Sequence, residues 1–198
     1  MRNRLFCIMG KSASGKDSLC RELMHDESLP FTPVVTYTTR PIRRRELEGR
    51  EYHFCTEKEY LRMKEEGRII EERCYMTEYG PWRYFTAEDG QIDLRRNSSL
   101  VIGTLQSLES FRKYYGKDMV VPLYIEVEDG ERLERALRRE RKQENPGYAE
   151  MCRRFLADSE DFSEDKLAAA GIKRRFENII KEDCLWELRT YIREKMRG

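Results

Sequence analysis

Short apolar runs alternate with amphipathic stretches along most of this chain. The most apolar runs, which are typical of buried strands, are 5–9, 100–104 and 120–127. Apolar residues recur at helical spacing in 17–25 and in a last helix with Leu185, Leu188, Ile192 and Met196 on one face. Helices are also expected at 106–115 and, with many basic side chains, at 132–141. Strands that alternate with helices in this way predict an α/β fold, in which helices flank a mainly parallel sheet.

The segment from about 36 to 90 breaks this alternation with shorter and more polar elements. In and next to it we expect a helix at 57–66, a turn at Gly80-Pro81, and short strands at 34–37, 69–74 and 83–86. The segment is therefore predicted to be a small lobe inserted into the main sheet. Further along, Asn145-Pro146-Gly147 interrupts a basic helix that resumes through Arg154, and a short strand is expected at 172–176.

Composition and charge exclude several classes of protein. The 198 residues include 38 basic and 37 acidic side chains, a net charge of +1, which favours neither a nucleic-acid partner nor a membrane surface. No apolar run approaches the about 18 residues of a spanning helix, and the one near the N-terminus is too short for a signal peptide. The six cysteines form no C-x-x-C pair, so reduced thiols and a cytoplasmic location are expected. The oligomeric state stays open.

The stretch from Gly10 to Ser18 nearly matches the phosphate-binding motif G-x-x-x-x-G-K-[ST]. Such a loop lies between a strand and a helix and turns successive N–H groups toward phosphate oxygens. The matching context disfavours the alternative, a turn that binds nothing. The residues predicted to hold ATP here are Gly10, Ser12, Ala13, Ser14, Gly15, Lys16, Asp17 and Ser18.

One position departs from this motif, because Asp17 stands where a hydroxyl normally holds Mg²⁺. Ser18 offers a hydroxyl one residue later, and the Asp17 carboxylate can accept hydrogen bonds from water bound to the metal. Both residues are therefore candidate Mg²⁺ ligands, Asp17 through water. Alternatively, Asp17 only stabilises the first turn of the helix through the helix dipole.

A second loop, from Thr36 to Phe54, is rich in arginine and contains Tyr52. Guanidinium groups suit phosphate oxygens because they donate two parallel hydrogen bonds. Taken alone, however, the composition favours a solvated basic loop over a phosphate site.

Together, the two loops resemble the guanylate kinase family, whose pattern is T-T-R-x-P-R-x-G-E-x-x-G-x-x-Y-x-F. The matching positions are Thr38, Thr39, Arg40, Arg43, Glu46, Gly49, Tyr52 and Phe54. The resemblance implies a P-loop NTPase fold and Mg²⁺- and ATP-dependent phosphoryl transfer to a nucleoside monophosphate, converting GMP to GDP. It further implies a core of about 1–35 and 99–198, an acceptor-binding lobe of about 36–90 and a lid of about 135–155.

The same resemblance assigns roles to individual residues. The residues implied to bind the acceptor are Thr36, Arg40, Arg43, Tyr52, Glu71, Tyr79 and Thr104. Among them, Glu71 matches the family glutamate that accepts the guanine N1 and N2 hydrogens. Asn178 falls near the donor adenine. The residues implied to be catalytic are Lys16, Arg40 and the lid arginines Arg135, Arg139 and Arg154.

The chain departs from the family pattern mainly where the base is recognised. Pro81 and Trp82 follow Gly80 in place of a hydroxyl residue, and Ile102 and Thr104 replace two aspartates. A different mononucleotide or a small phosphorylated acceptor therefore remains an alternative substrate. A catalytically silent interaction domain and a regulatory NTPase are alternatives of another class, although Lys16 argues against the former.

Overall fold

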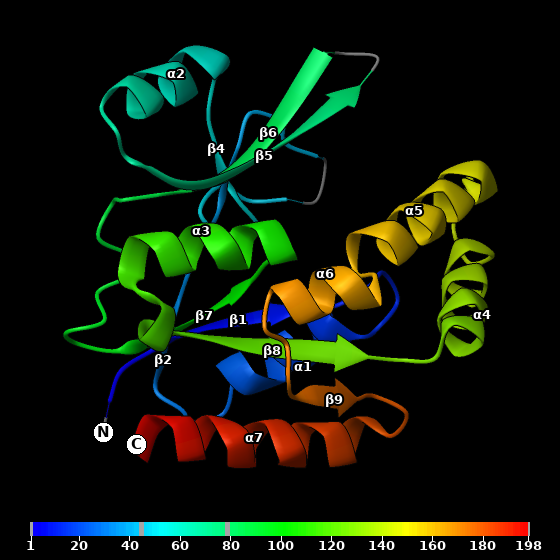
Figure 1. Ribbon diagram of the computed structural model, residues 1–198. Helices are drawn as coiled ribbons and strands as arrows, with labels where there is room; N and C mark the ends of the chain where they lie inside the picture. The colour runs from blue at the N-terminus through cyan, green and yellow to red at the C-terminus, as the bar shows by residue number, and fades with distance from the viewer. Residues whose placement is uncertain (1, 44–45, 78–79, 198) are drawn as a thin grey trace.

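A five-stranded parallel sheet forms the centre of the structure, a computed structural model that describes residues 2–43, 46–77 and 80–197 (Figure 1). Its strands, in spatial order, are β2 (Phe31–Pro33), β7 (Ser98–Ile102), β1 (Leu5–Met9), β8 (Val120–Glu126) and β9 (Arg175–Glu177). All neighbouring strands run parallel, with Phe6 opposite Leu100 on one side and Val121 on the other. The predicted α/β class with a mainly parallel sheet is confirmed.

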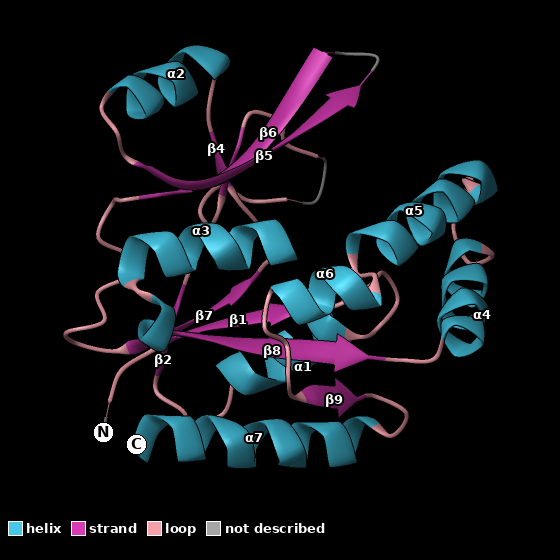
Figure 2. Cartoon of the chain, in the orientation of Figure 1, coloured by secondary structure: helices cyan, strands magenta, loops and turns pink. Residues whose placement is uncertain are grey.

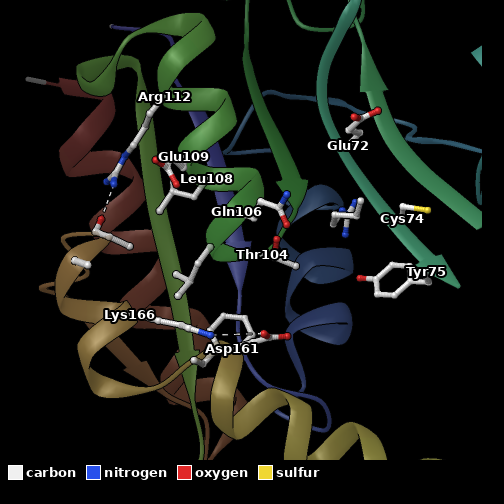
Figure 3. Close-up of a pocket in the computed structure, with 15 residues that line it drawn as sticks. Glu72, Cys74, Tyr75, Thr104, Gln106, Leu108, Glu109, Arg112, Asp161 and Lys166 are labelled. Carbon is white, nitrogen blue, oxygen red and sulfur yellow. Dashed lines mark hydrogen bonds and ion pairs between the residues drawn. The ribbon is translucent and has the colours of Figure 1, made fainter. Parts of the chain in front are cut away.

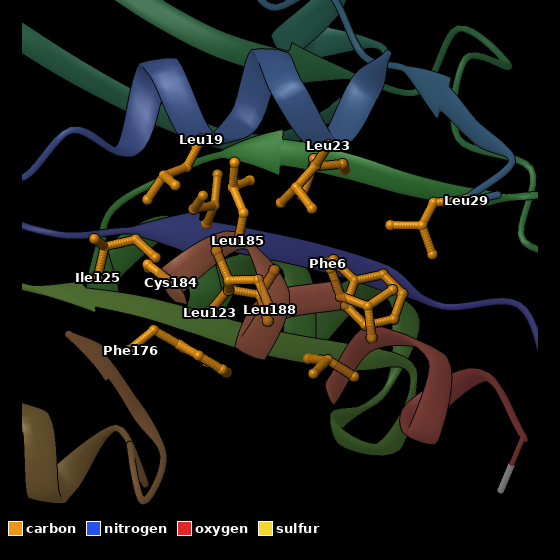
Figure 4. Packing of buried hydrophobic residues seen from close by; sticks show 14 of the residues in the cluster. Phe6, Leu19, Leu23, Leu29, Leu123, Ile125, Phe176, Cys184, Leu185 and Leu188 are labelled. Atoms are coloured by element: carbon orange, nitrogen blue, oxygen red, sulfur yellow. The ribbon is translucent and has the colours of Figure 1, made fainter. Parts of the chain in front are cut away.

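Helices cover both faces of this sheet, as Figure 2 shows. The helices are α1 (Lys16–Met24) and α7 (Lys181–Arg197) on one face, and α3 (Leu105–Tyr115) and α6 (Glu164–Ala169) on the other. The strand β1 explains why, since its side chains alternate between two buried clusters. Phe6 and Ile8 pack with α1 and α7 (Figure 4), while Leu5 and Met9 pack with α3 and α6. A strand buried on both faces requires the continuous apolar run seen in the sequence.

A second sheet lies beside the first and has its own small core. Its strands, in spatial order, are β4 (His53–Phe54), β3 (Tyr37–Thr38), β6 (Gly80–Ala87) and β5 (Ile69–Thr77). The helix α2 (Glu57–Glu65) packs Tyr60 and Met63 against Phe85 of this sheet. Thr56 begins α2 with a capping box, because its hydroxyl accepts from the Glu59 N–H and the Glu59 carboxylate accepts from Thr56.

Two further helices follow β8 and stand beyond the end of the main sheet (Figure 1). They are α4 (Asp129–Glu140) and α5 (Tyr148–Asp161), which contact each other. A short 3-10 helix, η1 (Lys117–Met119), precedes β8. No helix in the three described ranges is long and apolar enough to cross a membrane.

Several predicted elements differ from the structure. The strand expected at 34–37 is wrong, because β2 ends at Pro33 and β3 begins at Tyr37, where the chain has passed from one sheet to the other. Strands β5 and β6 are longer than predicted, so that Gly80 and Pro81 lie inside β6 and pair with β5. Strand β9 begins three residues later than expected, and α6 was not predicted.

The helix α7 offers a direct test of the packing. Leu188 is fully buried against the main sheet, whereas Trp186 on the same helix is 68% exposed. We expect Leu188→Ala to lower the free energy of unfolding by about 2–5 kcal/mol, because it leaves a cavity. Trp186→Ala should change it by about 0.5 kcal/mol or less. Urea denaturation followed by circular dichroism measures both, and equal effects of the two substitutions would contradict the packing described.

Candidate functional site

The loop from Gly10 to Gly15 joins β1 to α1 and is held against two neighbouring segments. A Cβ atom at Gly10 would lie 2.4 Å from the carbonyl oxygen of Ile125 on β8, and one at Gly15 would lie 2.4 Å from the Asn178 amide nitrogen. Ala13 and Gly15 both have left-handed backbone conformations, with φ of 64° and 84°. This curled backbone, placed at a helix N-terminus, has the geometry that binds phosphate groups.

Asn178 follows β9 and ties the end of the chain to this loop. Its Nδ2 donates a 2.7 Å hydrogen bond to the carbonyl of Ser14, and both residues are buried. Arg135 on α4 donates from Nη2 to the carbonyl of Asn178 at 3.0 Å and from Nε to Glu131 at 2.7 Å. Asn178 and Arg135, two predicted site residues that lie far from the loop in the sequence, are therefore brought next to it.

Lys16 begins α1, directly after the left-handed Gly15. Its Nζ lies 3.9 Å from a carboxylate oxygen of Asp17, which is 72% exposed, and Ser18 is exposed on the next position of the helix. Within the described ranges, no three His, Cys, Asp or Glu side chains gather closely enough to hold a metal ion on their own. The oxygens of Asp17 and Ser18 could hold a metal only together with water and a ligand.

Arg132 on α4 connects this helix to the loop. Its buried guanidinium donates to the carbonyl of Ser12 at 3.0 Å and to Asp129 at 2.7 and 3.0 Å, and it lies over the ring of Phe155 on α5. Burial raises the pKa of Asp129, but hydrogen bonds from Arg132 and Lys11 outweigh it, so this pKa is lowered overall. Asp129 therefore stays ionised and holds both basic side chains beside the loop.

The helix α5 places a carboxylate directly on the loop. Asp158 accepts a 2.7 Å hydrogen bond from the backbone N–H of Ser12. The predicted lid arginines Arg139 and Arg154 are exposed, and Arg154 pairs with Glu150 at 3.5 Å. Across the described ranges, neither arginine has a hydrogen bond or ion pair with the loop in this conformation.

Arg40, from the arginine-rich loop, is buried rather than solvated. It is 3% exposed, and its two terminal nitrogens donate to the two carboxylate oxygens of Glu46 at 2.8 Å each. Its guanidinium also lies 5.3 Å from the centre of the Tyr52 ring and 5.6 Å from that of Phe54. The hydrogen bonds with Glu46 raise the pKa of Arg40 and lower that of Glu46. Arg43 is exposed, and its backbone N–H donates to Glu46.

A narrow cavity of about 260 Å³ joins this loop to the phosphate-binding loop. Its lining includes Thr36 and Tyr52 from the second sheet region, Asp17 from α1, Ile102 from β7 and Arg73 from β5. Burial raises the pKa of Tyr52, so its hydroxyl remains a hydrogen-bond donor at neutral pH. Residues from both predicted loops thus face one common cavity.

A wider cavity of about 830 Å³ lies on the other side of Arg73, between β5, α3 and α6 (Figure 3). Thr104 lines it and begins α3, where its hydroxyl accepts from the Ser107 N–H at 3.2 Å. Glu71, which is 3% exposed, accepts hydrogen bonds from the hydroxyls of Ser107 at 2.9 Å and Thr86 at 3.0 Å. The predicted site residue Tyr79 lies outside the described residues.

Sequence reasoning did not identify three residues that contribute to this site. Arg132 stands one helical turn before Arg135, so helical spacing could have indicated it. Arg73 lies two residues after Glu71, and alternation along a strand puts both on the same face. Asp158 gives no such signal, because its contact with Ser12 depends on how α5 folds back onto the loop.

Comparisons with known proteins agree with this arrangement. The family model described as guanylate kinase matches residues 2–192. A guanylate kinase of Thermotoga maritima is 34% identical over 116 residues, which are 58% of this chain and 54% of the relative. Guanylate kinase 2, chloroplastic/mitochondrial, of Oryza sativa subsp. japonica is 27% identical over 67% of this chain and 45% of the relative. The matched part thus spans about half the length of these curated relatives.

A solved structure shows the same fold over nearly the whole chain. The crystal structure of guanylate kinase from Anaplasma phagocytophilum superposes with a TM-score of 0.64 at 18% identity, over 99% of this chain and 87% of that one. The family match covers both loops described above and extends from β1 to α7. This chain therefore belongs to the guanylate kinase family.

Proposed function

We propose that this protein transfers the γ-phosphoryl group of ATP to GMP, giving ADP and GDP. One observation carries the proposal above all. The helix that follows the phosphate-binding loop and the arginine-rich loop of the second sheet line the same narrow cavity. A phosphoryl donor on the first loop and a phosphorylated acceptor beside the second would therefore meet within one site.

Catalysis in such a site requires positioning and charge neutralisation rather than a covalent intermediate. Lys16 and the loop N–H groups would hold the donor phosphates. Arg40 would orient the acceptor phosphate, because Glu46 and the rings of Tyr52 and Phe54 fix the plane of its guanidinium. Tyr52 would add a hydroxyl donor to the same phosphate.

We further propose that the second sheet with α2 is the acceptor lobe and that α4 and α5 form the lid. Arg135 already contacts Asn178 next to the loop, whereas Arg139 and Arg154 would reach the phosphates only when the lid closes. Closure of this kind excludes water from the transferring phosphoryl group. All six cysteines are free thiols, which fits a cytoplasmic location with abundant nucleotides.

Mg²⁺ fits this site as a partner of ATP. The Asp17 carboxylate and the Ser18 hydroxyl supply oxygen ligands, which Mg²⁺ prefers, and Asp17 faces the narrow cavity. Bound there with the donor phosphates, the ion would neutralise charge that develops on them. Asp17 would orient water around the metal. Ile102, which replaces an aspartate of the family pattern, has no polar atom and cannot do so.

Lys16→Ala should abolish most phosphoryl transfer without unfolding the protein. In a phosphate-binding loop of this kind the ammonium group lies beside the β- and γ-phosphates of the donor, so we expect kcat to fall about a hundredfold or more. A coupled ADP-release assay with ATP and GMP measures the loss, and a thermal melt checks the fold. Near-normal turnover by the folded variant would contradict the proposed role of the loop.

Asp17→Asn tests the metal role against a purely helical one. If Asp17 orients water around Mg²⁺, the substitution raises the Mg²⁺ concentration for half-maximal rate, and excess metal restores much of the activity. If it only stabilises the first turn of α1, the cost is roughly 0.3–1 kcal/mol of stability and the Mg²⁺ titration overlays that of the wild type. Asp183→Asn in the first turn of α7 is the matched control, because Asp183 lines neither cavity.

Glu46→Gln should weaken binding of the acceptor and leave binding of ATP largely unchanged. Loss of a carboxylate that holds both nitrogens of Arg40 should raise the KM for GMP roughly tenfold, since hydrogen bonds between charged groups are worth about 1.5–3 kcal/mol. Glu66→Gln at the end of α2 is the control, because Glu66 pairs with Arg62 and Arg68 at the surface of the same lobe. Steady-state kinetics with each substrate varied in turn give both KM values, and equal changes for ATP and GMP would exclude this role.

A further inference from the structure

Arg73 occupies the boundary between the two cavities of the site. It lies on β5 two residues after Glu71, on the same face of the strand, and its side chain is 18% exposed. It lines both the narrow cavity, beside Thr36 and Tyr52, and the wide one, beside Thr104. This guanidinium is therefore shared by the two cavities.

The contacts of Glu71 show what Arg73 does in this conformation. A carboxylate has about four acceptor directions, and the hydroxyls of Thr86 and Ser107 take one on each oxygen. Arg73 stands across the remaining two, with Nη2 3.4 Å from Oε1 and Nε 3.3 Å from Oε2. These distances exceed the about 2.7–2.9 Å of a charge-assisted hydrogen bond.

The pairing between the two side chains is therefore loose. Arg73 Nε, although buried, has no hydrogen-bond partner within the described residues. The two hydroxyls, and not Arg73, fix the carboxylate in place, so the guanidinium can turn away without releasing Glu71. While it remains, it compensates a buried negative charge that would otherwise be costly.

With Arg73 turned aside from the two remaining acceptor directions of Glu71, these groups would form an edge that complements guanine. The Watson–Crick edge of guanine presents an acceptor, O6, followed by two donors, the N1 and N2 hydrogens. A guanidinium beside a carboxylate with two open directions presents one donor followed by two acceptors. Adenine, with a 6-amino donor and an N1 acceptor, opposes this pattern at both positions. A site built to hydrogen-bond one edge rejects another because its own polar groups remain unpaired.

We propose that Arg73 is a specificity-determining residue, which donates to the 6-oxo group of the acceptor guanine while Glu71 accepts from N1 and N2. This inference rests on the proposed function for GMP as the acceptor. When guanine binds, the Arg73 guanidinium moves away from the Glu71 carboxylate and turns toward the guanine O6, so that the two remaining acceptor positions of Glu71 become free for N1 and N2.

The test compares three acceptors that differ at single groups of the base. These are GMP, 6-thioguanosine 5′-monophosphate, which changes only the 6-oxygen to a poorer acceptor, and IMP, which lacks only the 2-amino group. The variants are Arg73→Met, which removes all donors but keeps much of the bulk, and Arg73→Lys, which keeps the charge beside Glu71. Coupled assays give kcat/KM, and calorimetry without ATP gives the Kd of each acceptor.

For the wild type we expect GMP to be preferred over the thio analogue by about tenfold or more, the worth of a hydrogen bond from a charged donor. Arg73→Met should reduce this ratio to within about twofold while the GMP-to-IMP ratio, which depends on Glu71, changes little. Arg73→Lys should give an intermediate ratio. Should Arg73→Met fail to fold in a thermal melt, the ratio for Arg73→Lys decides, because that variant keeps the charge pair.

Two outcomes separate this inference from the proposed activity. If GMP is phosphorylated but both variants keep the wild-type ratio of GMP to its thio analogue, Arg73 only supports Glu71, and the inference fails while the activity stands. If the wild type transfers no phosphate yet binds GMP with the predicted ratios, the activity fails and the inference stands. Failure to bind GMP, or a preference for a pyrimidine or adenine nucleotide, overturns the inference.

Discussion

The close approach of three segments of the chain underlies the whole site. The loop after β1 touches the backbone of β8 at Gly10 and the Asn178 side chain after β9 at Gly15, and a Cβ atom at either glycine would clash. This contact fixes the curl of the loop, the direction of its N–H groups and the start of α1. Asn178 then uses the same proximity to hold Ser14, so the last strand of the sheet positions the first loop of the chain.

The sequence predicted the elements whose side chains are buried in a regular pattern. The strands β1, β7 and β8 and the helix α7 follow from apolar runs and spacings, because the main core requires them. The ends of β5 and β6 could not be predicted this way. Cys74, Tyr75 and Met76 are exposed, and this part of the hairpin is held by backbone pairing with residues 81–83.

The site shows a similar division between local and distant information. The curled backbone of the loop from Gly10 to Gly15 follows from the sequence, because its residues are contiguous and its glycines permit that conformation. Glu71 was singled out as a candidate, but its partners Thr86 and Ser107 were not, since strand register and the docking of α3 bring them there. Conversely, Arg40 belongs to a basic loop whose composition suggests solvation, and only the fold reveals that Glu46 and two rings enclose it.

The carboxylate of Asp158 occupies an anion-binding position of the phosphate-binding loop. This carboxylate accepts from the Ser12 amide and lies 3.7 Å from Arg132, which is the chemistry that a phosphate oxygen would offer at the same place. A nucleotide phosphate arriving at that amide would thus exchange one anion for another, and its net gain is only the difference between the two. The displaced carboxylate belongs to α5. Phosphate binding at the loop would therefore be coupled to the position of α5, a helix that lies outside the sequence motif.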